Sequence, residues 1–211
     1  MQTTAIGDGL ALLAAALPLM GSPGPAVLSC AATASAFGIR AALPYYFGIV
    51  AGTATVLLMI ATGVTGLVLA LPLAAPVLAG LGLCYMLYLA YRIATAPVLG
   101  EKPAQDAQRP GWKGGYLLAV ANPKAFTVFG ALFAGAHIAG FAPVPEAGIK
   151  IALLTGMIFA VNLIWLLAGA ALARFLRHPR LGRAINIGFA LLLLLSVGSA
   201  VWDMVWAAVT K

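Results

Sequence analysis

The sequence carries little charge of either sign. Only 8% of its 211 residues are charged and 63% are hydrophobic, with a mean hydropathy of +1.05. A soluble globular domain carries roughly 25% charged residues. A water-soluble fold of this length could not cover so much apolar surface with so few polar groups, whereas a bilayer tolerates apolar side chains on the outside of a fold. The composition therefore predicts an integral membrane protein and excludes a soluble one.

Cysteine and histidine are also scarce. Cys30 and Cys84 both lie inside apolar runs, which predicts small buried side chains rather than a disulfide or a metal-binding pair. His137 and His178 are separated from each other and from any cluster of acids or cysteines, so no metal site and no cofactor are predicted. The net charge is +7, but no basic face interleaved with aromatic residues accompanies it, so nucleic acid is not an expected partner.

Long continuous apolar runs fill most of the chain and predict α-helices rather than the strands of a closed barrel. Proline, glycine and charged residues divide them into six expected spans, at about 4–37, 43–71, 77–95, 114–140, 147–176 and 181–209. Pro72 and Pro76 are expected to mark the turn after the second span. We expect a single transmembrane domain over 1–211, with one half at about 1–96, a solvated loop at about 97–113 and a second half at about 114–211.

Lysine and arginine are distributed unequally between the expected connections. Nine of them fall in the three connections that follow odd-numbered spans, and only Lys150 and Lys211 fall on the opposite side. Connections rich in Lys and Arg stay on the cytoplasmic side of a membrane. The distribution therefore predicts that both termini face outward.

Two of the expected spans contain proline well inside an apolar run. Pro23 and Pro25 flank Gly24 in the first span, and Pro123 interrupts the fourth span about 100 residues later. Proline removes a backbone donor and clashes with the preceding turn, so each site is expected to break its helix. Paired broken helices in two three-helix halves, which must be inverted because three is odd, are typical of transporters. Helix packing alone is the alternative explanation of the prolines.

Lys124 follows the second break and is the one basic residue expected within the membrane, away from the connections. A charge there costs about 2.5–3.5 kcal/mol on insertion scales, so we expect it to anchor a substrate carboxylate beside Asn122. Snorkelling of its side chain to the headgroups is the alternative. Asn162 and Tyr45 are further candidates for substrate binding, although a buried Asn can also bond only to a neighbouring helix.

Small residues in the second span indicate close helix contact. Gly48 and Gly52 lie four residues apart, which predicts a face where another helix approaches closely. The glycine-rich helices also leave room for a homodimer. No nucleophile with a visible base lies in the spans, since Ser22 and Ser29 have no histidine partner at membrane depth, so an enzyme is not expected.

Three segments resemble the LysE/RhtB family of amino-acid exporters: PGPAVL (23–28), LGLCYMLYLAYR (81–92) and GGYLLAVANPKAFTVFGALFAG (114–135). The resemblance covers nearly the whole chain and matches the family's PGP to Pro23, Gly24 and Pro25, and its NPK to Asn122, Pro123 and Lys124. It implies efflux of amino acids or close derivatives across the bacterial inner membrane, driven by proton antiport. The expected partners are thus a small amino acid and membrane lipid.

The chain departs from this family at two polar positions. Ala26 stands where the family commonly has Asn, and Thr53 stands where it often has Asp. These departures argue against a substrate with a cationic side chain. The five acids all lie in connections or near outer helix ends, so the carrier of a coupling proton stays open between Lys124, an outer aspartate and no coupling at all. A permease or exporter of another small anion or metal ion, and a non-transporting scaffold, are the alternative functions.

Overall fold

The computed structural model describes residues 4–63, 74–95, 110–175 and 179–209, and every regular element in these ranges is a helix. The all-helical prediction is therefore confirmed for this part of the chain. The helices are α1 (Ala5–Gly21), α2 (Pro25–Phe37), α3 (Ile39–Ala61), α5 (Ala74–Ala94), α6 (Trp112–Val120), α7 (Pro123–Gly135), α8 (Pro143–Phe175) and α9 (Pro179–Val209).

The described helices include several that could cross a bilayer. α3 and the Pro143–Leu172 part of α8 are each long and apolar enough to do so alone. The α1–α2 pair and the α6–α7 pair also qualify if each counts as one broken span, with bends of 61° and 59° between their two helices. α5 and α9 contribute shorter apolar stretches, Leu83–Ala94 and Leu181–Leu195. This architecture is compatible with a membrane protein.

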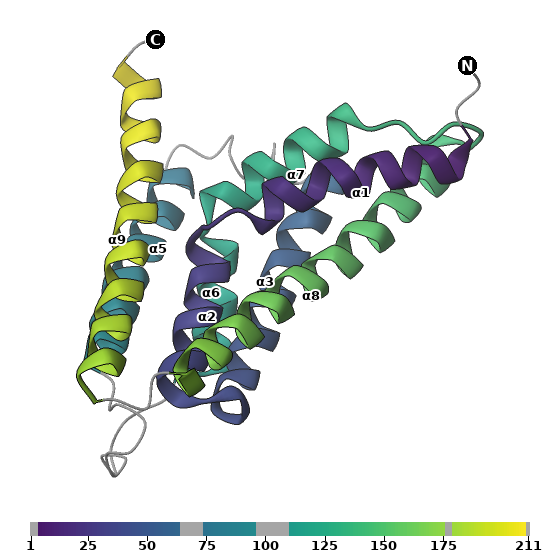
Figure 1. The fold of residues 1–211 in the computed structure, drawn as a ribbon. Coiled ribbons are helices and arrows are strands. Elements are labelled where there is room, and N and C mark those ends of the chain that lie inside the picture. Colours follow the sequence, from purple (N-terminus) through teal and green to yellow (C-terminus); the bar gives the residue numbers. More distant parts are fainter. Residues whose placement is uncertain (1–3, 64–73, 96–109, 176–178, 210–211) are drawn as a thin grey trace.

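The second helix of each half packs against the broken helix of the other half. α3 contacts both α6 and α7, and α8 contacts both α1 and α2. α5 and α9, the last helices of the two halves, pair with each other along one side of the molecule (Figure 1). Two helix breaks far apart in the sequence are thereby enclosed by helices of both halves.

Glycine permits the closest of these helix contacts. A Cβ atom built on Gly48 of α3 would lie 2.0 Å from the carbonyl oxygen of Trp112 on α6. In the contact between α8 and α2, a Cβ on Gly169 would lie 2.1 Å from the carbonyl oxygen of Ala31. No real side chain fits at such a distance, so the backbones of these helix pairs approach each other only because both positions are glycine.

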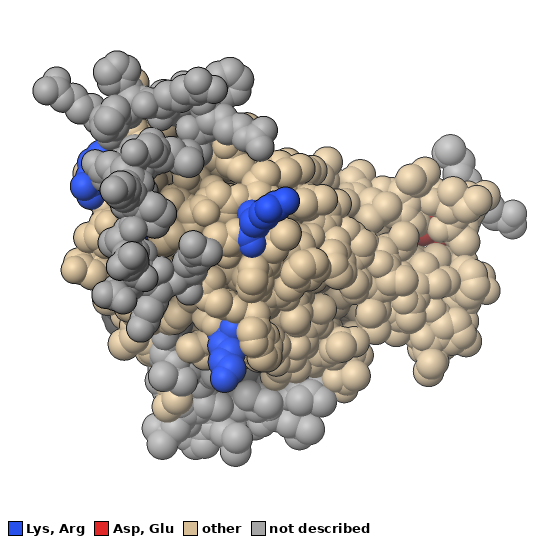
Figure 2. Space-filling model, turned by 90° about the horizontal axis from the view of Figure 1, so that it is seen from below, with Lys and Arg blue, Asp and Glu red and all other residues tan. Residues whose placement is uncertain are grey.

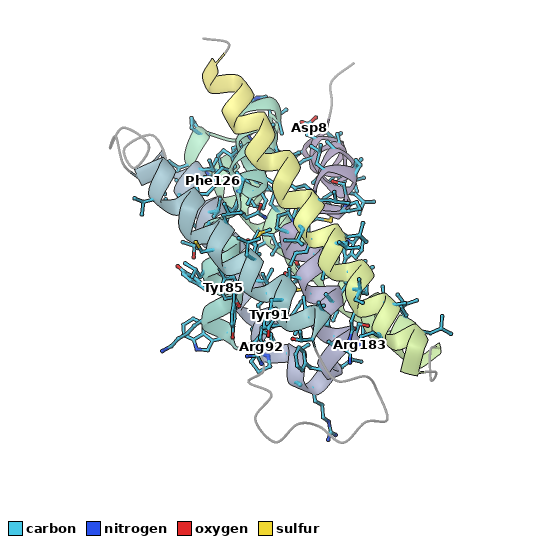
Figure 3. All side chains as sticks on the ribbon, turned by 90° about the vertical axis from the view of Figure 1, so that its left-hand side faces the viewer. Asp8, Tyr85, Tyr91, Arg92, Phe126 and Arg183 are labelled. Carbon is cyan, nitrogen blue, oxygen red and sulfur yellow. The ribbon has the colours of Figure 1, made fainter. Side chains whose placement is uncertain are left out.

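Basic side chains mark one end of the helix bundle. α3 and α6 begin there with exposed Arg40 and Lys113, and α9 begins there with exposed Arg183. Figure 2 views this end, where blue basic side chains stand out from a largely tan surface. Arg92 and Arg183 lie at this end, whereas Asp8 lies at the opposite one (Figure 3).

Some helix ends differ from the sequence prediction. α3 begins at Ile39 rather than 43, because the chain turns at Gly38 (φ +80°) and the helix continues one turn beyond the apolar run. α8 likewise begins at Pro143 rather than 147. Pro76 was expected in a turn but lies in the first turn of α5, where proline is tolerated. Cys84 is exposed on the bundle surface instead of buried. Pro72, His178, residues 64–71 and most of the 97–113 loop lie outside the described residues.

Candidate functional site

The first break separates the end of α1 from the start of α2. α1 ends at Gly21, after which the amide of Ser22 donates to the carbonyl of Pro18 at 3.0 Å. α2 begins with Pro25, a residue that suits the first helical position because it has no N–H to satisfy. Gly24 precedes it and provides no side-chain cap. The last carbonyls of α1 and the first amides of α2 therefore face the same gap.

The second break has the same local form. α6 ends at Val120, and Pro123 occupies the first position of α7. The preceding residue, Asn122, caps α7 because its side-chain oxygen accepts a hydrogen bond from the amide of Lys124 at 3.2 Å. Both predicted proline breaks are thus present, and in each case the proline starts a new helix rather than kinking one that continues.

Lys124 connects the two breaks. Its Nζ donates to the carbonyl oxygen of Ser22 at 2.7 Å, to the hydroxyl oxygen of Ser22 at 2.8 Å and to the carbonyl oxygen of Pro23 at 3.5 Å. The side chain is only partly exposed and crosses directly over Gly24, where a Cβ atom would lie 2.9 Å from its Cδ. The ammonium of Lys124, which follows the second break, is thus directed to the first break, between α1 and α2. Sequence reasoning considered Ser22 only as a nucleophile and missed this contact.

A cavity of about 50 Å³ lies where the two breaks meet. Among the described residues that line it, Lys124 is the only charged one. The other polar side chains in the lining are those of Thr53, Asn122 and Asn162. Its remaining walls are glycine and apolar residues: Leu19, Met20, Gly24, Ala26, Val27, Ala125, Val128, Phe129 and Val161. The space is enough for water molecules and combines convergent polar groups with apolar walls, as small-molecule sites do.

The polar residues of this cavity differ in how they are bonded. Asn162 of α8 is buried, donates to the carbonyl of Ile158 at 2.9 Å and lies 3.9 Å from the sulfur of Cys30 on α2. Thr53 of α3 is only 8% exposed, and its hydroxyl makes no hydrogen bond with another described residue. Thr53 therefore presents a free polar group to the cavity. The sequence singled it out only as a departure from a family pattern.

Three other predicted residues lie elsewhere. Tyr45 is completely buried on α3 but is not among the residues lining the cavity, so the structure does not bring it to the other substrate-binding candidates. Gly48 and Gly52 face α6, and a Cβ on Gly52 would lie 2.6 Å from the carbonyl oxygen of Tyr116. The cavity candidates that do come together are Lys124, Asn122 and Asn162.

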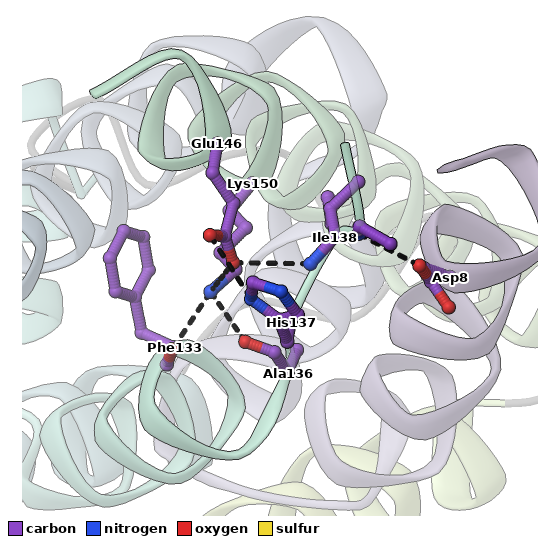
Figure 4. A network of polar contacts seen from close by, with 8 residues as sticks. Asp8, Phe133, Ala136, His137, Ile138, Glu146 and Lys150 are labelled. Atoms are coloured by element: carbon purple, nitrogen blue, oxygen red, sulfur yellow. Dashed lines mark hydrogen bonds and ion pairs between the residues drawn. The ribbon is translucent and has the colours of Figure 1, made fainter. Parts of the chain in front are cut away.

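A second polar cluster holds the connection between α7 and α8 (Figure 4), which lies at the end of the bundle opposite the basic one (Figure 1). Lys150 Nζ lies 2.7 Å from Glu146 Oε1, and it also donates to the carbonyls of Phe133, at 3.3 Å, and Ala136. Glu146 Oε1 accepts in turn from the amide of Ile138 at 3.1 Å. The Glu146–Lys150 pair thus supplies hydrogen-bond partners to the backbone carbonyl and amide groups where α7 ends.

The same cluster corrects one sequence prediction. Glu146 was expected in an outer connection, but α8 begins early enough to place it on the helix, one turn before Lys150. His137 Nδ1 also lies 3.2 Å from Glu146 Oε2. Asp8 of α1 also joins, accepting from the amide of Ala139 at 2.9 Å. Across the described residues, no three His, Cys, Asp or Glu side chains gather as a metal site requires.

Comparison with known proteins adds one match. The family model described as "LysE type translocator" matches residues 17–209, a range that includes both helix breaks and every residue that lines the cavity. No curated protein and no solved structure matches the chain. The match covers most of the sequence and agrees with the resemblance of its proline motifs. The chain therefore belongs to the LysE type translocator family.

Proposed function

We propose that this protein is a secondary transporter that exports amino acids or close derivatives across the bacterial inner membrane. The observation that carries the proposal is the position of Lys124, a cation at the meeting point of two broken helices in a LysE type translocator. Broken helices at membrane depth are tolerated where they line a cavity, and a cation inside a span is costly enough to mark a functional site.

The cavity offers two partners to a carboxylate. One is the ammonium of Lys124, and the other is the start of α2, where Ala26 and Val27 line the cavity and no side chain caps the helix. A helix start carries a partial positive charge and free amide donors, both of which favour an anion. The free hydroxyl of Thr53 and the amide of Asn162 supply further polar contacts on the facing walls.

The lining also favours an uncharged cargo side chain. Its walls are mostly apolar, and none of the residues that line it in the described part of the chain is acidic. A cationic side chain would therefore lose its hydration without gaining a counter-charge. The same absence of carboxylate, thiolate and imidazole ligands disfavours a metal-ion permease. An amino acid with a small neutral side chain fits the cavity best.

We further infer six spans arranged as two inverted halves. The contacts between helices of the two halves support this arrangement, because α3 packs on the α6–α7 pair while α8 packs on the α1–α2 pair. The basic end of the bundle is then cytoplasmic, and both termini lie outside. Movement of one half against the other would expose the cavity to each side in turn, because the site lies between the halves.

We assign the driving force to proton antiport. In the described part of the chain the carboxylates Asp8 and Glu146 lie near the outer end, and Glu146 is bonded to a largely buried Lys150. Protonation of Glu146 would remove the partner of a buried cation, so this pair links proton binding to the contacts between α7 and α8. In the inner cavity, Lys124 is the only charged group among the described lining residues.

Counterflow in proteoliposomes tests the proposal. Vesicles containing the purified chain are loaded with one unlabelled amino acid at a time, and uptake of the same labelled amino acid is followed with and without a pH gradient. The proposal expects uptake of at least one small neutral amino acid above protein-free vesicles, faster with the gradient. Absence of uptake across all twenty amino acids would contradict the transport assignment, whereas uptake unaffected by the gradient would contradict only the antiport.

A further inference from the structure

The ammonium of Lys124 occupies a site built from the end of α1. Three acceptors surround it: the carbonyl and hydroxyl oxygens of Ser22 and the carbonyl oxygen of Pro23. A primary ammonium has three N–H donors and no acceptor, so the number of acceptors equals the number of donors. We call these three oxygens the ammonium cradle.

The ammonium cradle is held in place without help from Lys124. The hydroxyl of Ser22 donates to the carbonyl of Leu19 at 3.0 Å, so its oxygen is left to accept from the ammonium. The carbonyl of Gly21, one residue earlier, accepts from Trp165 Nε1 of α8 at 3.1 Å. These bonds fix the direction of the last turn of α1, whose carbonyls give the helix end a partial negative charge suited to a cation.

Lys124 reaches the ammonium cradle from the other half of the molecule, across the edge of the cavity. Gly24 and Lys124 both line that cavity, so a ligand inside it would lie against the Lys124 side chain. A carboxylate there would attract the ammonium away from neutral carbonyl oxygens, because hydrogen bonds between two charged groups are the stronger ones. Gly24 follows Pro23 in the sequence and lines the cavity, so movement of Lys124 would leave three oxygen acceptors uncovered beside the cavity's edge.

We propose that the ammonium cradle is the binding site for the primary ammonium of the cargo, and that Lys124 fills it as an internal substitute when the cavity is empty. This inference rests on the proposed transport of amino acids, whose ammonium and carboxylate sit on one carbon atom. The cargo carboxylate pairs with Lys124, and the cargo ammonium takes the oxygens that Lys124 leaves. Each state of the carrier thus keeps the carbonyls of Ser22 and Pro23 hydrogen-bonded to an ammonium.

Because the cargo ammonium must take the place of the Lys124 ammonium in the cradle, the proposal requires a cargo with a free amine. An N-acetylated amino acid keeps its carboxylate but has no cation for the cradle, so it would leave the oxygens of Ser22 unsatisfied in the bound state. Ser22→Ala removes one of the three acceptors and should weaken binding of the free amino acid about tenfold, while binding of the acetylated form should not change. Ser29→Ala is the matched control, because that hydroxyl also donates to a carbonyl three residues earlier, at 2.8 Å, but lies outside the cradle.

A binding experiment tests the cradle without measuring transport. Lys124→Ala removes three carbons and the ammonium, which together correspond to n-propylammonium. We expect added n-propylammonium, up to about 100 mM, to raise the unfolding temperature of purified Lys124→Ala by about 2–4 °C, with no rise for the wild-type chain. Tetramethylammonium carries the same charge without N–H donors and should have no effect. Adding Ser22→Ala to Lys124→Ala should reduce the rise.

The possible results separate the cradle from the transport proposal. An equal rise in the wild-type chain, an equal rise with tetramethylammonium, or no rise in Lys124→Ala would overturn the cradle and leave transport of amino acids standing. If Lys124→Ala does not elute as a monodisperse species, the wild-type chain decides: counterflow that is equal for a free amino acid and its N-acetyl derivative contradicts the cradle. Counterflow of the free amino acid alone supports it, and counterflow of neither contradicts the proposed function itself.

Discussion

Lys124 Nζ lies 2.7 Å from the carbonyl oxygen of Ser22, a residue 102 positions earlier in the chain. One hydrogen-bonded ammonium thereby holds together two helix breaks that belong to different halves of the protein. The contact has a direct mechanical consequence, because any ligand that changes the position of Lys124 also changes how the two breaks are joined. A substrate can bias such an equilibrium only by binding its two states unequally, and under the proposal the Lys124–Ser22 contact is the one that differs.

Thr53 is expected to contribute to substrate affinity but not to folding. Thr53→Val removes a hydroxyl that has no described partner and keeps the shape of the side chain. We expect KM for the transported amino acid to rise about three- to tenfold, the effect of one neutral hydrogen bond, with an unchanged unfolding temperature. Thr62→Val, at the end of the same helix, removes a hydroxyl bonded to the carbonyl of Leu58 and should leave KM unchanged. Equal KM values for the two variants would remove Thr53 from the site.

Gly48 is expected to be essential for the contact between α3 and α6. The added methyl group of Gly48→Ala would lie 2.0 Å from the carbonyl oxygen of Trp112, which is backbone and cannot turn away. We expect a loss of about 1–3 kcal/mol in the free energy of unfolding. Gly156→Ala on α8, where no atom lies within 4 Å of the new methyl group, is the control and should stabilise the helix slightly. Thermal unfolding in detergent compares them, and equal unfolding temperatures would contradict the described packing.

The Glu146–Lys150 pair is expected to stabilise the end of the bundle opposite the basic one. Glu146→Gln leaves the ammonium of Lys150, whose side chain is only 8% exposed, without its counter-charge. The unfolding temperature should fall clearly, because a buried charge without a partner is destabilising. Glu146→Gln combined with Lys150→Met should recover much of the loss. His137→Ala changes a side chain that is 76% exposed and should have little effect. A double variant less stable than Glu146→Gln would contradict this explanation.

Local sequence rules were sufficient to locate the helix breaks. Pro25 and Pro123 lack the N–H that a continuing helix needs, and both occur at the first position of a new helix. Lys124, Asn122 and Asn162, which the sequence analysis named as candidates for substrate binding, all line one cavity, and their role in binding stays a prediction. These features depend on backbone chemistry and on the cost of polar groups in lipid, which a sequence states directly.

Contacts across the fold could not be obtained in this way. The partners of Lys124 are carbonyl oxygens, and every residue has one, so no sequence pattern identifies Ser22 and Pro23 as acceptors. Tyr45 shares α3 with Thr53, but only the relative rotation of the packed helices decides that Thr53 lines the cavity and Tyr45 does not. Glu146 was placed in a connection because the start of α8 lies beyond its most apolar stretch.

The orientation of the chain is a separate expectation. The end of the bundle that carries Arg40, Lys113 and Arg183 should face the cytoplasm, with both termini on the other side. Fusions of alkaline phosphatase, which is active only outside the cytoplasm, and of green fluorescent protein, which fluoresces only inside it, can be compared at the C-terminus. We expect phosphatase activity without fluorescence. Fluorescence at the C-terminus would reverse the proposed direction of transport relative to the fold.

The central claim is that Lys124 binds the cargo where the two broken helices meet, and one comparison of two lysine variants tests it most directly. Lys124→Ala removes the cavity's cation, whereas Lys113→Ala removes an exposed lysine in the first turn of α6. Counterflow of a small neutral amino acid should fall about 30-fold or more in kcat/KM for Lys124→Ala, the loss expected for about 2 kcal/mol of binding to a charged partner. Lys113→Ala should retain the wild-type rate. Equal rates for monodisperse preparations of both variants would contradict the claim.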